Sequence, residues 1–365
     1  MEKQFDAHCH HLFDMTLEEA VSVFEEEFRA TGTARETFLA LPCDVNEDGA
    51  FTFSDMQNIR MLFLKHAFSP TAYAYAGLEH PINVRECSDE YLSELYLTQV
   101  REYMASGFDG VKMFEGYPSM RKTMGRPLYH EVYDKFYSYL EDNAIPVTMH
   151  LANPETFWDA SKIDAYSKAK GRYCDETYPT KAQLHSELER VMQKHPRLRI
   201  AIAHFGFMAY DIKMAEAWLE NYPNTVIDIT PGGEQLLMIS AAWNMWRPFF
   251  EKYQDRIIYG SDAYAFPRGE SFVTCYQRRP EFMRRLFETD GEYDYVNRPF
   301  RGIMLDKSIR QKIYYDNAVR LFGEPKKINY GYLLKKAEEL LATKGNGDKN
   351  REFDLQYIIQ SCKDL

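Results

Sequence analysis

Short apolar runs alternate along the chain with longer amphipathic segments. A run of four to eight apolar residues is typical of a buried strand, and apolar residues at every third or fourth position over a longer segment are typical of a helix. Strands are predicted at residues 4–10, 37–42, 72–78, 108–114, 145–151, 198–204, 225–230 and 256–261. The helices predicted after them cover residues 16–30, 54–68, 88–106, 129–143, 180–194, 211–221 and 234–253. Thr16 and Ser54 are the expected N-caps of the first two helices, and Gly107 is expected to end the third.

This regular alternation predicts βαβ units and therefore a parallel sheet. Eight strands over about 260 residues fit the size of a (β/α)8 TIM barrel. An open doubly wound sheet is the competing architecture. The chain has no Gly-x-Gly-x-x-Gly loop after the first strand, which favours the barrel.

The loops that follow strands are much longer than the loops that precede them. The long ones cover residues 46–53, 115–128, 152–179 and 263–306, and the last has room for its own helix near residues 271–288. In a barrel all of these loops lie at the C-terminal face, where active sites are built. We expect residues 1–323 to form the barrel domain. Residues 324–365 are expected to form a C-terminal helical extension that packs on the barrel or on a partner subunit.

The bulk composition limits the partners and the compartment. The net charge of −11 argues against nucleic acid or an anionic membrane surface as the main partner. Six cysteines without a Cys-x-x-Cys pair fit free thiols in a reducing compartment. The sequence opens without an apolar signal-peptide stretch, and no 18-residue apolar window predicts a membrane span. We therefore expect a cytoplasmic protein that acts on a small molecule; a homodimer is compatible with the sequence but not required by it.

Histidine and aspartate stand at the C-terminal ends of several predicted strands. His8 and His10 end the first strand, His150 the fifth, His204 the sixth and Asp262 the eighth. A closed barrel brings these strand ends into one ring. Imidazole and carboxylate ligands suit Zn²⁺, Mn²⁺ or Fe²⁺, so the pattern predicts a metal site.

Strand alternation sorts the neighbours of these residues. His8 and His10 share one face, and Cys9 points the other way as a packing thiol. Asp6, two positions before His8, is expected on the ligand face, where it would orient a ligand imidazole. His11 is assigned to the loop, and Glu115 at the barrel mouth is a candidate substrate contact. Five other histidines fall in helices or turns and are interpreted as structural: His66, His80, His130, His185 and His195.

Several of these segments together resemble the amidohydrolase superfamily, and within it the amidohydrolase-related branch of barrel hydrolases and decarboxylases. The resemblance covers about residues 4–323. It is carried by Asp6-Ala7-His8-Cys9-His10, Gly110-Val111-Lys112, Val147-Thr148-Met149-His150, Ala203-His204-Phe205-Gly206, Tyr259-Gly260-Ser261-Asp262 and Asn317-Ala318-Val319-Arg320-Leu321-Phe322. The last of these looks like the C-terminal signature of the branch.

The resemblance implies a role for each matching residue. His8, His10 and His150 correspond to metal ligands, and Asp262 corresponds to a ligand that also moves protons. His204 is a ligand in two-metal members and acts on the substrate in one-metal members. Lys112 stands where some members carry a carboxylated lysine that bridges two metals. One metal is favoured, with Zn²⁺ as the first choice, and two metals remain an alternative.

Three functions are compatible with these residues. The favoured one is hydrolysis of a small amide, lactone or other ester by metal-activated water, with His204 or the metal stabilising the oxyanion. The second is non-oxidative decarboxylation of an aromatic or unsaturated acid, with an arginine of a mouth loop holding the carboxylate. Arg121, Arg126, Arg172 and Arg268 are the candidates for that contact. The third is a barrel without catalytic activity that keeps a metal for stability or sensing.

Overall fold

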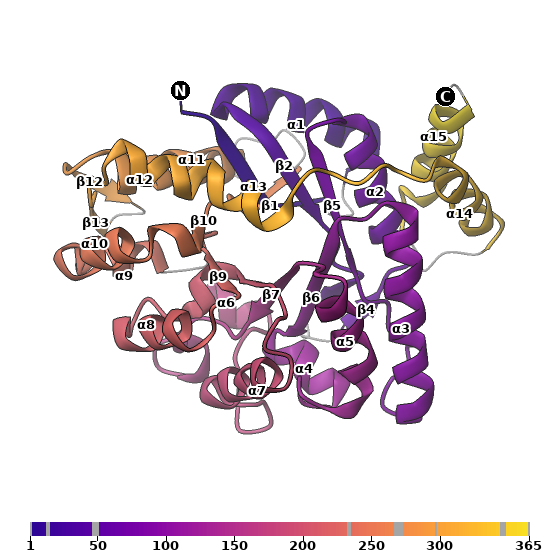
Figure 1. Ribbon diagram of the computed structural model, residues 1–365, viewed down its shortest axis with the longest axis horizontal. Helices are drawn as coiled ribbons and strands as arrows, with labels where there is room; N and C mark the ends of the chain where they lie inside the picture. Colours follow the sequence, from indigo (N-terminus) through magenta and orange to yellow (C-terminus); the bar gives the residue numbers. More distant parts are fainter. Residues whose placement is uncertain are drawn as a thin grey trace.

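The centre of the molecule is a parallel sheet that curls into a nearly closed barrel (Figure 1). The computed structural model describes residues 2–11, 15–45, 51–231, 235–265, 273–295, 298–343 and 348–363. Within these residues the strand order is β10-β9-β8-β7-β6-β5-β2-β1-β11. The bounds of the barrel strands are β1 (Gln4–His11), β2 (Thr33–Leu39), β5 (Ala72–Gly77), β6 (Gly110–Gly116), β7 (Val147–Leu151), β8 (Ile200–Ile202), β9 (Thr225–Asp228), β10 (Ile257–Ile258) and β11 (Ala263–Ala265).

The last pass of the chain closes the barrel in two pieces. Strand β10 pairs with β9, and β11, which follows after four intervening residues, pairs with β1. Between the two pieces, the Tyr259 carbonyl accepts a hydrogen bond from the Ala7 amide over 3.0 Å. The eighth strand therefore joins the seventh to the first, as a (β/α)8 barrel requires. The predicted barrel is confirmed, and the open sheet is excluded.

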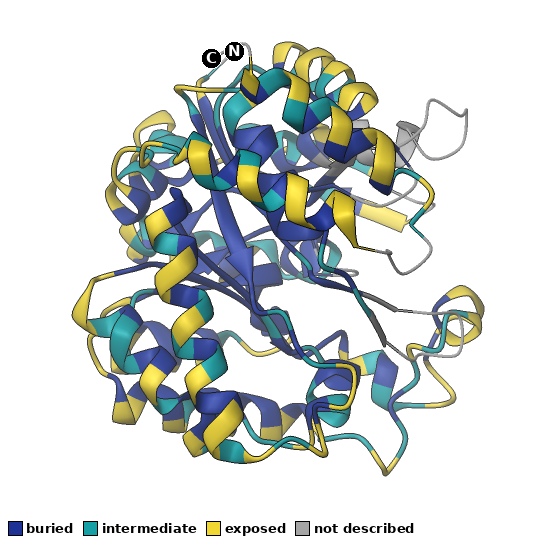
Figure 2. Cartoon of the chain, turned by 90° about the vertical axis from the view of Figure 1, so that its right-hand side faces the viewer, coloured by how far each residue is buried: buried dark blue, intermediate teal, exposed yellow. Residues whose placement is uncertain are grey.

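Helices cover the outside of the barrel, with their exposed faces turned away from the buried strands (Figure 2). Their bounds are α1 (Leu17–Thr31), α2 (Gln57–Ala67), α3 (Asp89–Ser106), α4 (Pro118–Met124), α5 (Asp134–Asp142), α6 (Ala165–Ala169), α7 (Lys181–Lys194), α8 (Ile212–Asn221), α9 (Gln235–Ala241), α10 (Trp243–Lys252), α11 (Val273–Glu288), α12 (Lys307–Gln311), α13 (Asn317–Phe322), α14 (Tyr330–Ala342) and α15 (Arg351–Lys363). Two antiparallel hairpins complete the fold, β3 (Cys43–Val45) with β4 (Phe51–Phe53) and β12 (Glu292–Tyr295) with β13 (Arg298–Arg301). None of the helices in the described ranges has a stretch long and apolar enough to cross a membrane.

Two of the three predicted helix caps are confirmed. Thr16 caps α1 in a capping box with Glu19, and Gly107 ends α3 in the left-handed conformation at φ 103°. The predicted Ser54 cap is wrong. Helix α2 begins at Gln57, and the Ser54 hydroxyl instead accepts a hydrogen bond from the Met56 amide over 3.2 Å. A serine that bonds an amide two residues on forms a local turn, and this turn delays the helix.

The N-terminal end of the barrel is filled by aromatic side chains. The Phe322 ring packs edge-on against Phe5 and Tyr75, with ring centroids 5.3 Å apart in each case. The Tyr73 ring lies tilted against Phe5, with centroids 5.0 Å apart. Asn317 ties α13 to this end, because its amide donates to the carbonyls of Gln254 and Ile257 over 2.7 Å each. The predicted signature segment therefore closes the bottom of the barrel.

The last two helices pack beside the first two. Helix α14 contacts α2 and α3, and α15 contacts α1 (Figure 1). Leu333 and Ala337 of α14, and Leu355 and Ile358 of α15, belong to the same apolar cluster as Phe24 of α1. The extension predicted at residues 324–365 thus lies against the barrel through α14 and α15.

Candidate metal centre

A β-bulge in β1 decides which of its side chains face the barrel interior. Asp6 lies opposite Glu36 of β2 and Cys9 lies opposite Phe38, so three steps of β1 match two steps of β2. The extra residue breaks the alternation ahead of His8. Cys9 packs outward into the cluster beneath the helices, as predicted.

The role predicted for Asp6 is wrong because of this bulge. Its carboxylate accepts hydrogen bonds from the backbone amides of His8 over 3.2 Å and Ser261 over 2.9 Å, and from the Ser261 hydroxyl. It therefore fastens β1 to the last strand and does not orient an imidazole.

His8, His10 and Asp262 converge at the C-terminal end of the barrel. The two histidine Nε2 atoms are 3.0 Å apart, and Asp262 Oδ1 lies 3.9 Å from His8 Nε2 and 3.7 Å from His10 Nε2. All three residues are buried, and one ligand atom of each lies within 4.8 Å of the others. Gly260 permits this approach, because a Cβ there would lie 2.7 Å from His8 Cβ.

The partners of the other ring nitrogens fix the protonation of these imidazoles. His10 Nδ1 lies 2.7 Å from the Leu39 carbonyl, which only accepts, so Nδ1 carries the proton. His8 Nδ1 lies 2.6 Å from the Asp228 carboxylate and donates to it. In the neutral rings both Nε2 atoms then present lone pairs at a separation of 3.0 Å. Two lone pairs that face each other in a buried site repel unless a cation lies beside them.

Asp228, at the end of β9, was missed by the sequence analysis. Burial raises its pKa to about 6, and hydrogen bonds from Thr230 oppose the shift. The Thr230 amide and hydroxyl both donate to Asp228 Oδ1, which leaves Oδ2 for His8. A carboxylate that fixes the tautomer of a metal-binding imidazole is a common feature of metal sites. The predicted seventh strand, residues 225–230, contains this aspartate, but its predicted end lay two residues beyond Asp228, so Asp228 was not recognised as a strand-end residue.

Lys112 lies beside this group on β6. Its Nζ is 3.3 Å from His8 Nε2, and the residue is 1% exposed. Burial lowers the pKa of Lys112 to about 8, against the opposing effect of Asp228 and Asp262. The Lys112 amine can therefore act as the cation that balances Asp228 and Asp262, or it can lose its proton and be carboxylated.

His204 and His150 form the next part of the site. The His204 ring lies 5.2 Å from the His8 ring and 4.8 Å from the His150 ring. His150 Nε2 lies 3.0 Å from the Ala152 carbonyl and therefore carries the proton, so the lone pair of this ring is on Nδ1. Burial lowers the pKa of His150 to about 3, which keeps the ring neutral. Within the described residues, the tight three-ligand group contains neither His150 nor His204.

The backbone around these side chains is strained. His204 and Phe205 have φ of 55° and 57° in the turn η3 (Ala203–Phe207), and Asp262 has φ of 54°. Side chains other than glycine seldom adopt this left-handed region, and such conformations cluster at functional sites. These left-handed residues turn the backbone after β8 and β10 over the barrel mouth.

The remaining candidates lie outside this group. His11 is 1% exposed and points toward Arg60 of α2. Glu115 is also buried and binds His80 Nε2 over 2.9 Å, which makes His80 part of a buried ion pair behind β6.

The donor set fits a divalent metal. Two neutral imidazoles and one carboxylate, all buried and convergent, are typical of a catalytic site that keeps a coordination position open. Carboxylate and imidazole donors do not choose between Zn²⁺, Mn²⁺ and Fe²⁺. The fold and this site together define a (β/α)8 barrel with a candidate metal centre at its C-terminal end.

Comparison with known proteins identifies the family. A family model described as Amidohydrolase matches residues 94–323, which is more than half of the chain. The chain therefore belongs to the amidohydrolase family, as its motifs predicted. The match includes Lys112, His150, His204 and Asp262, whereas His8 and His10 precede it. None of the curated proteins matches the chain.

Solved structures support the fold. An uncharacterised TIM-barrel protein from Bordetella bronchiseptica has a TM-score of 0.54 and 13% identity, covering 87% of this chain and 98% of that one. A 4-oxalomesaconate hydratase from Rhodopseudomonas palustris has a TM-score of 0.50 and 15% identity, covering 88% and 95%. A 2,6-dihydroxybenzoate decarboxylase complexed with 2,6-dihydroxybenzoate has the same score and identity, covering 88% and 99%. These identities show a shared fold and leave the reaction open.

Proposed function

We propose that this amidohydrolase-family enzyme is a metal-dependent hydrolase of a small amide, lactone or other ester. The observation that carries the proposal is the facing pair of His8 and His10 Nε2 atoms, 3.0 Å apart, with Asp262 Oδ1 within 3.9 Å of both. Three protein ligands leave a position for water, which is the arrangement of hydrolytic zinc sites. Zn²⁺ is the first choice, and one metal is favoured.

His8, His10 and Asp262 would hold the metal. His150, predicted as a further ligand, lies outside this group, with its lone pair on Nδ1. A bound divalent metal supplies a Lewis acid and lowers the pKa of its water from 15.7 towards about 7. Asp262 is the group placed to accept a proton from the attacking water and to deliver it to the leaving group. His204 and Lys112 flank the site and are placed to stabilise negative charge on the carbonyl oxygen.

A second candidate, decarboxylation of an aromatic or unsaturated acid, is favoured by the aromatic rings beside His150. Phe114 and Tyr117 stack 4.7 Å apart, and their centroids lie 5.2 and 5.1 Å from the His150 ring. Such a wall suits a planar substrate.

The contacts of the arginines at the barrel mouth indicate which of them could bind a substrate carboxylate. Arg121 forms a bidentate pair with Glu187, and Arg126 binds Asp89 and backbone carbonyls. Both are committed to structural contacts. Arg172 lies 5.8 Å from the Tyr166 ring and is exposed, which makes it the better candidate for a substrate carboxylate. Arg268 lies outside the described residues.

Labelled water separates the two reactions. The protein is stripped with a chelator, reloaded with Zn²⁺ or Mn²⁺, and assayed in H₂¹⁸O against lactones, amides and aromatic acids. A hydrolase incorporates ¹⁸O into its organic product in a metal-dependent way. A decarboxylase releases CO₂ and leaves its organic product without ¹⁸O. Metal-independent turnover, or turnover that survives Asp262→Asn, would contradict the proposal.

A further inference from the structure

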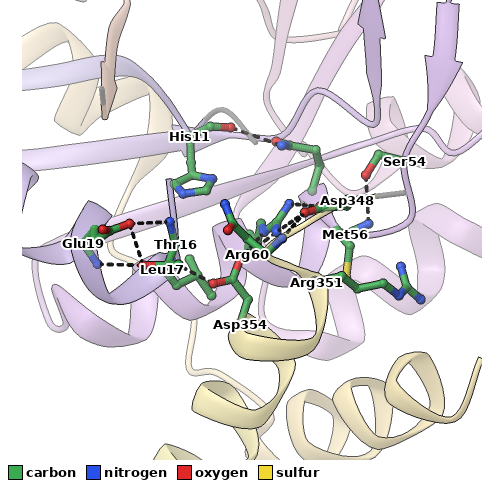
Figure 3. A network of polar contacts seen from close by, with 12 residues as sticks. His11, Thr16, Leu17, Glu19, Ser54, Met56, Arg60, Asp348, Arg351 and Asp354 are labelled. Atoms are coloured by element: carbon green, nitrogen blue, oxygen red, sulfur yellow. Dashed lines mark hydrogen bonds and ion pairs between the residues drawn. The ribbon is translucent and has the colours of Figure 1, made fainter. Parts of the chain in front are cut away.

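A fully buried arginine, Arg60 of α2, links the C-terminal segment to the barrel (Figure 3). A second link joins Arg351 of α15 to Asp55. Arg60 Nε donates to Asp354 Oδ2 over 2.7 Å, and its two terminal nitrogens bind Asp348 over 2.6 and 3.2 Å. Arg60 and Asp354 are both 0% exposed. A guanidinium that holds two carboxylates in fixed geometry resists displacement, because breaking either pair leaves a buried charge without compensation.

Asp354 also holds the start of α1. Its Oδ1 accepts a hydrogen bond from the Leu17 amide over 2.8 Å, while Oδ2 binds Arg60. Leu17 is the first residue of α1, so one carboxylate of α15 connects the N-terminal turns of α1 and α2. These turns follow β1 and β2 and lie at the metal end of the barrel.

The same helix turn reaches the end of β1. Gln57, one turn before Arg60, is 2% exposed and donates through Nε2 to the His11 carbonyl over 3.1 Å. His11 follows the predicted ligand His10 directly, and its side chain points toward Arg60 (Figure 3). On the outer face, Cys9 packs in the cluster that includes Leu355 of α15.

From this chain of contacts we propose that Arg60 is a positioning residue for the metal centre. Asp348 and Asp354 of the C-terminal segment fix Arg60, Arg60 fixes the first turn of α2, and Gln57 in that turn fixes the end of β1 that carries His8 and His10. The C-terminal segment thereby sets the spacing of the first two metal ligands. This inference rests on the proposed metal site and adds residues that touch neither metal nor substrate.

Helix α2 supplies a matched control at its other end. Lys65 Nζ donates to Asp109 Oδ2 and to the Gly107 carbonyl, each over 2.7 Å, and Lys65 is 2% exposed. This is also a buried cation on α2 that binds a carboxylate, but its partners lie at the N-terminal end of β6. Lys65→Met therefore damages the same helix without touching the contacts of β1.

The test measures Co²⁺ binding to the chelator-stripped full chain, by affinity and by visible absorption spectrum. We expect Gln57→Leu and Arg60→Lys each to weaken Co²⁺ binding roughly tenfold or more and to change the absorption bands, as loss of supporting contacts does in other metal sites. Lys65→Met should lower the melting temperature yet keep the affinity within about twofold. If Arg60→Lys does not fold, Gln57→Leu carries the test, because it removes one neutral contact.

A double variant tests the order of the contacts. Asp354→Asn should weaken Co²⁺ binding in the unaltered background and have little further effect in the Gln57→Leu background, because both act through α2. Unchanged affinity and spectrum in both Gln57→Leu and Arg60→Lys would overturn the positioning role. Absence of Co²⁺ binding by the unaltered protein would instead overturn the proposed metal site.

Discussion

The two ends of the barrel interior differ in the polarity of their side chains. At the N-terminal end, the interior is filled by the tilted and edge-on rings of Phe5, Tyr73, Tyr75 and Phe322. At the C-terminal end the interior holds imidazoles, carboxylates and one lysine, all buried. Burying apolar surface stabilises the fold, whereas burying ionisable groups costs free energy unless they are paired or bind a metal. The N-terminal end therefore contributes stability, whereas the C-terminal end holds the candidate site.

Backbone conformation shows the same division. Five of the seven non-glycine residues with positive φ in the described ranges follow β7, β8 and β10: Ala152, His204, Phe205, Phe207 and Asp262. The other two, Ala144 and Met304, lie before β7 and before α12. Each left-handed residue of this kind costs about 1–3 kcal/mol unless its surroundings hold it. The aromatic packing at the other end helps to offset that cost. Five substitutions, ordered by expected effect, test whether the two ends act separately.

The largest effect is expected from His10→Ala. It removes one of the three convergent ligands, and a single ligand of a structural zinc site corresponds to about 4 kcal/mol of binding free energy, or roughly a thousandfold in affinity. Metal content after gel filtration and Zn²⁺ affinity by competition with a chelator measure it. Retention of metal at the unaltered affinity would place the site elsewhere.

Phe322→Ala is the corresponding change at the opposite end. Deleting this ring removes the contacts with Phe5 and Tyr75, and a buried Phe→Ala substitution costs about 3 kcal/mol of unfolding free energy at the lower end of its range. Phe322 is 8% exposed, which favours the lower value. Urea denaturation measures the loss, and Zn²⁺ affinity of the folded fraction should stay unchanged. A large drop in that affinity would show that the two ends are coupled.

Much of this contrast could be predicted from the sequence. The candidate site could be located because four of the eight predicted strands end at or beside a histidine or aspartate, and barrel closure then required His8, His10 and Asp262 to meet. The C-terminal signature at residues 317–322 was recognised as a motif, but its place at the bottom of the barrel needed the structure.

Other features depend on contacts that no local pattern encodes. The bulge in β1 exists because β1 and β2 pair with unequal steps, so simple alternation put Asp6 on the wrong face. Which nitrogen of His150 carries the lone pair depends on the left-handed turn at Ala152, whose carbonyl accepts the Nε2 proton. The link from Asp354 to Arg60 spans 294 positions and joins two helices that look unrelated in the sequence.

Asp228→Asn is expected to have an intermediate effect at the metal end. The amide cannot reproduce the charged acceptor for His8 Nδ1, so the tautomer that presents Nε2 to the metal is less favoured. Metal affinity should fall by about 10- to 100-fold, which is about 1.4–2.7 kcal/mol. Chelator competition measures it, with Asp255→Asn on the surface near η4 (Gln254–Arg256) as the control. Equal affinities in the two variants would remove Asp228 from the site.

The smallest effects are expected from deleting one hydroxyl at each end. Tyr73→Phe removes a phenol that donates to the Gly323 carbonyl and accepts from Arg35, both over 2.6 Å. These groups are part-buried, so the loss should be about 1 kcal/mol of unfolding free energy, with no change in metal affinity.

Thr230→Val removes the hydroxyl that donates to Asp228 Oδ1 and keeps the shape of the side chain. Because Thr230 is 0% exposed, its loss should lower stability by a similar amount, about 1 kcal/mol. It should also weaken metal binding by a few-fold, since Asp228 then holds His8 less firmly. Both variants lose one hydroxyl, so thermal unfolding should rank them as near equals while chelator competition separates them. If Tyr73→Phe weakened metal binding as much as Thr230→Val, the inference that only the C-terminal end affects metal binding would be wrong.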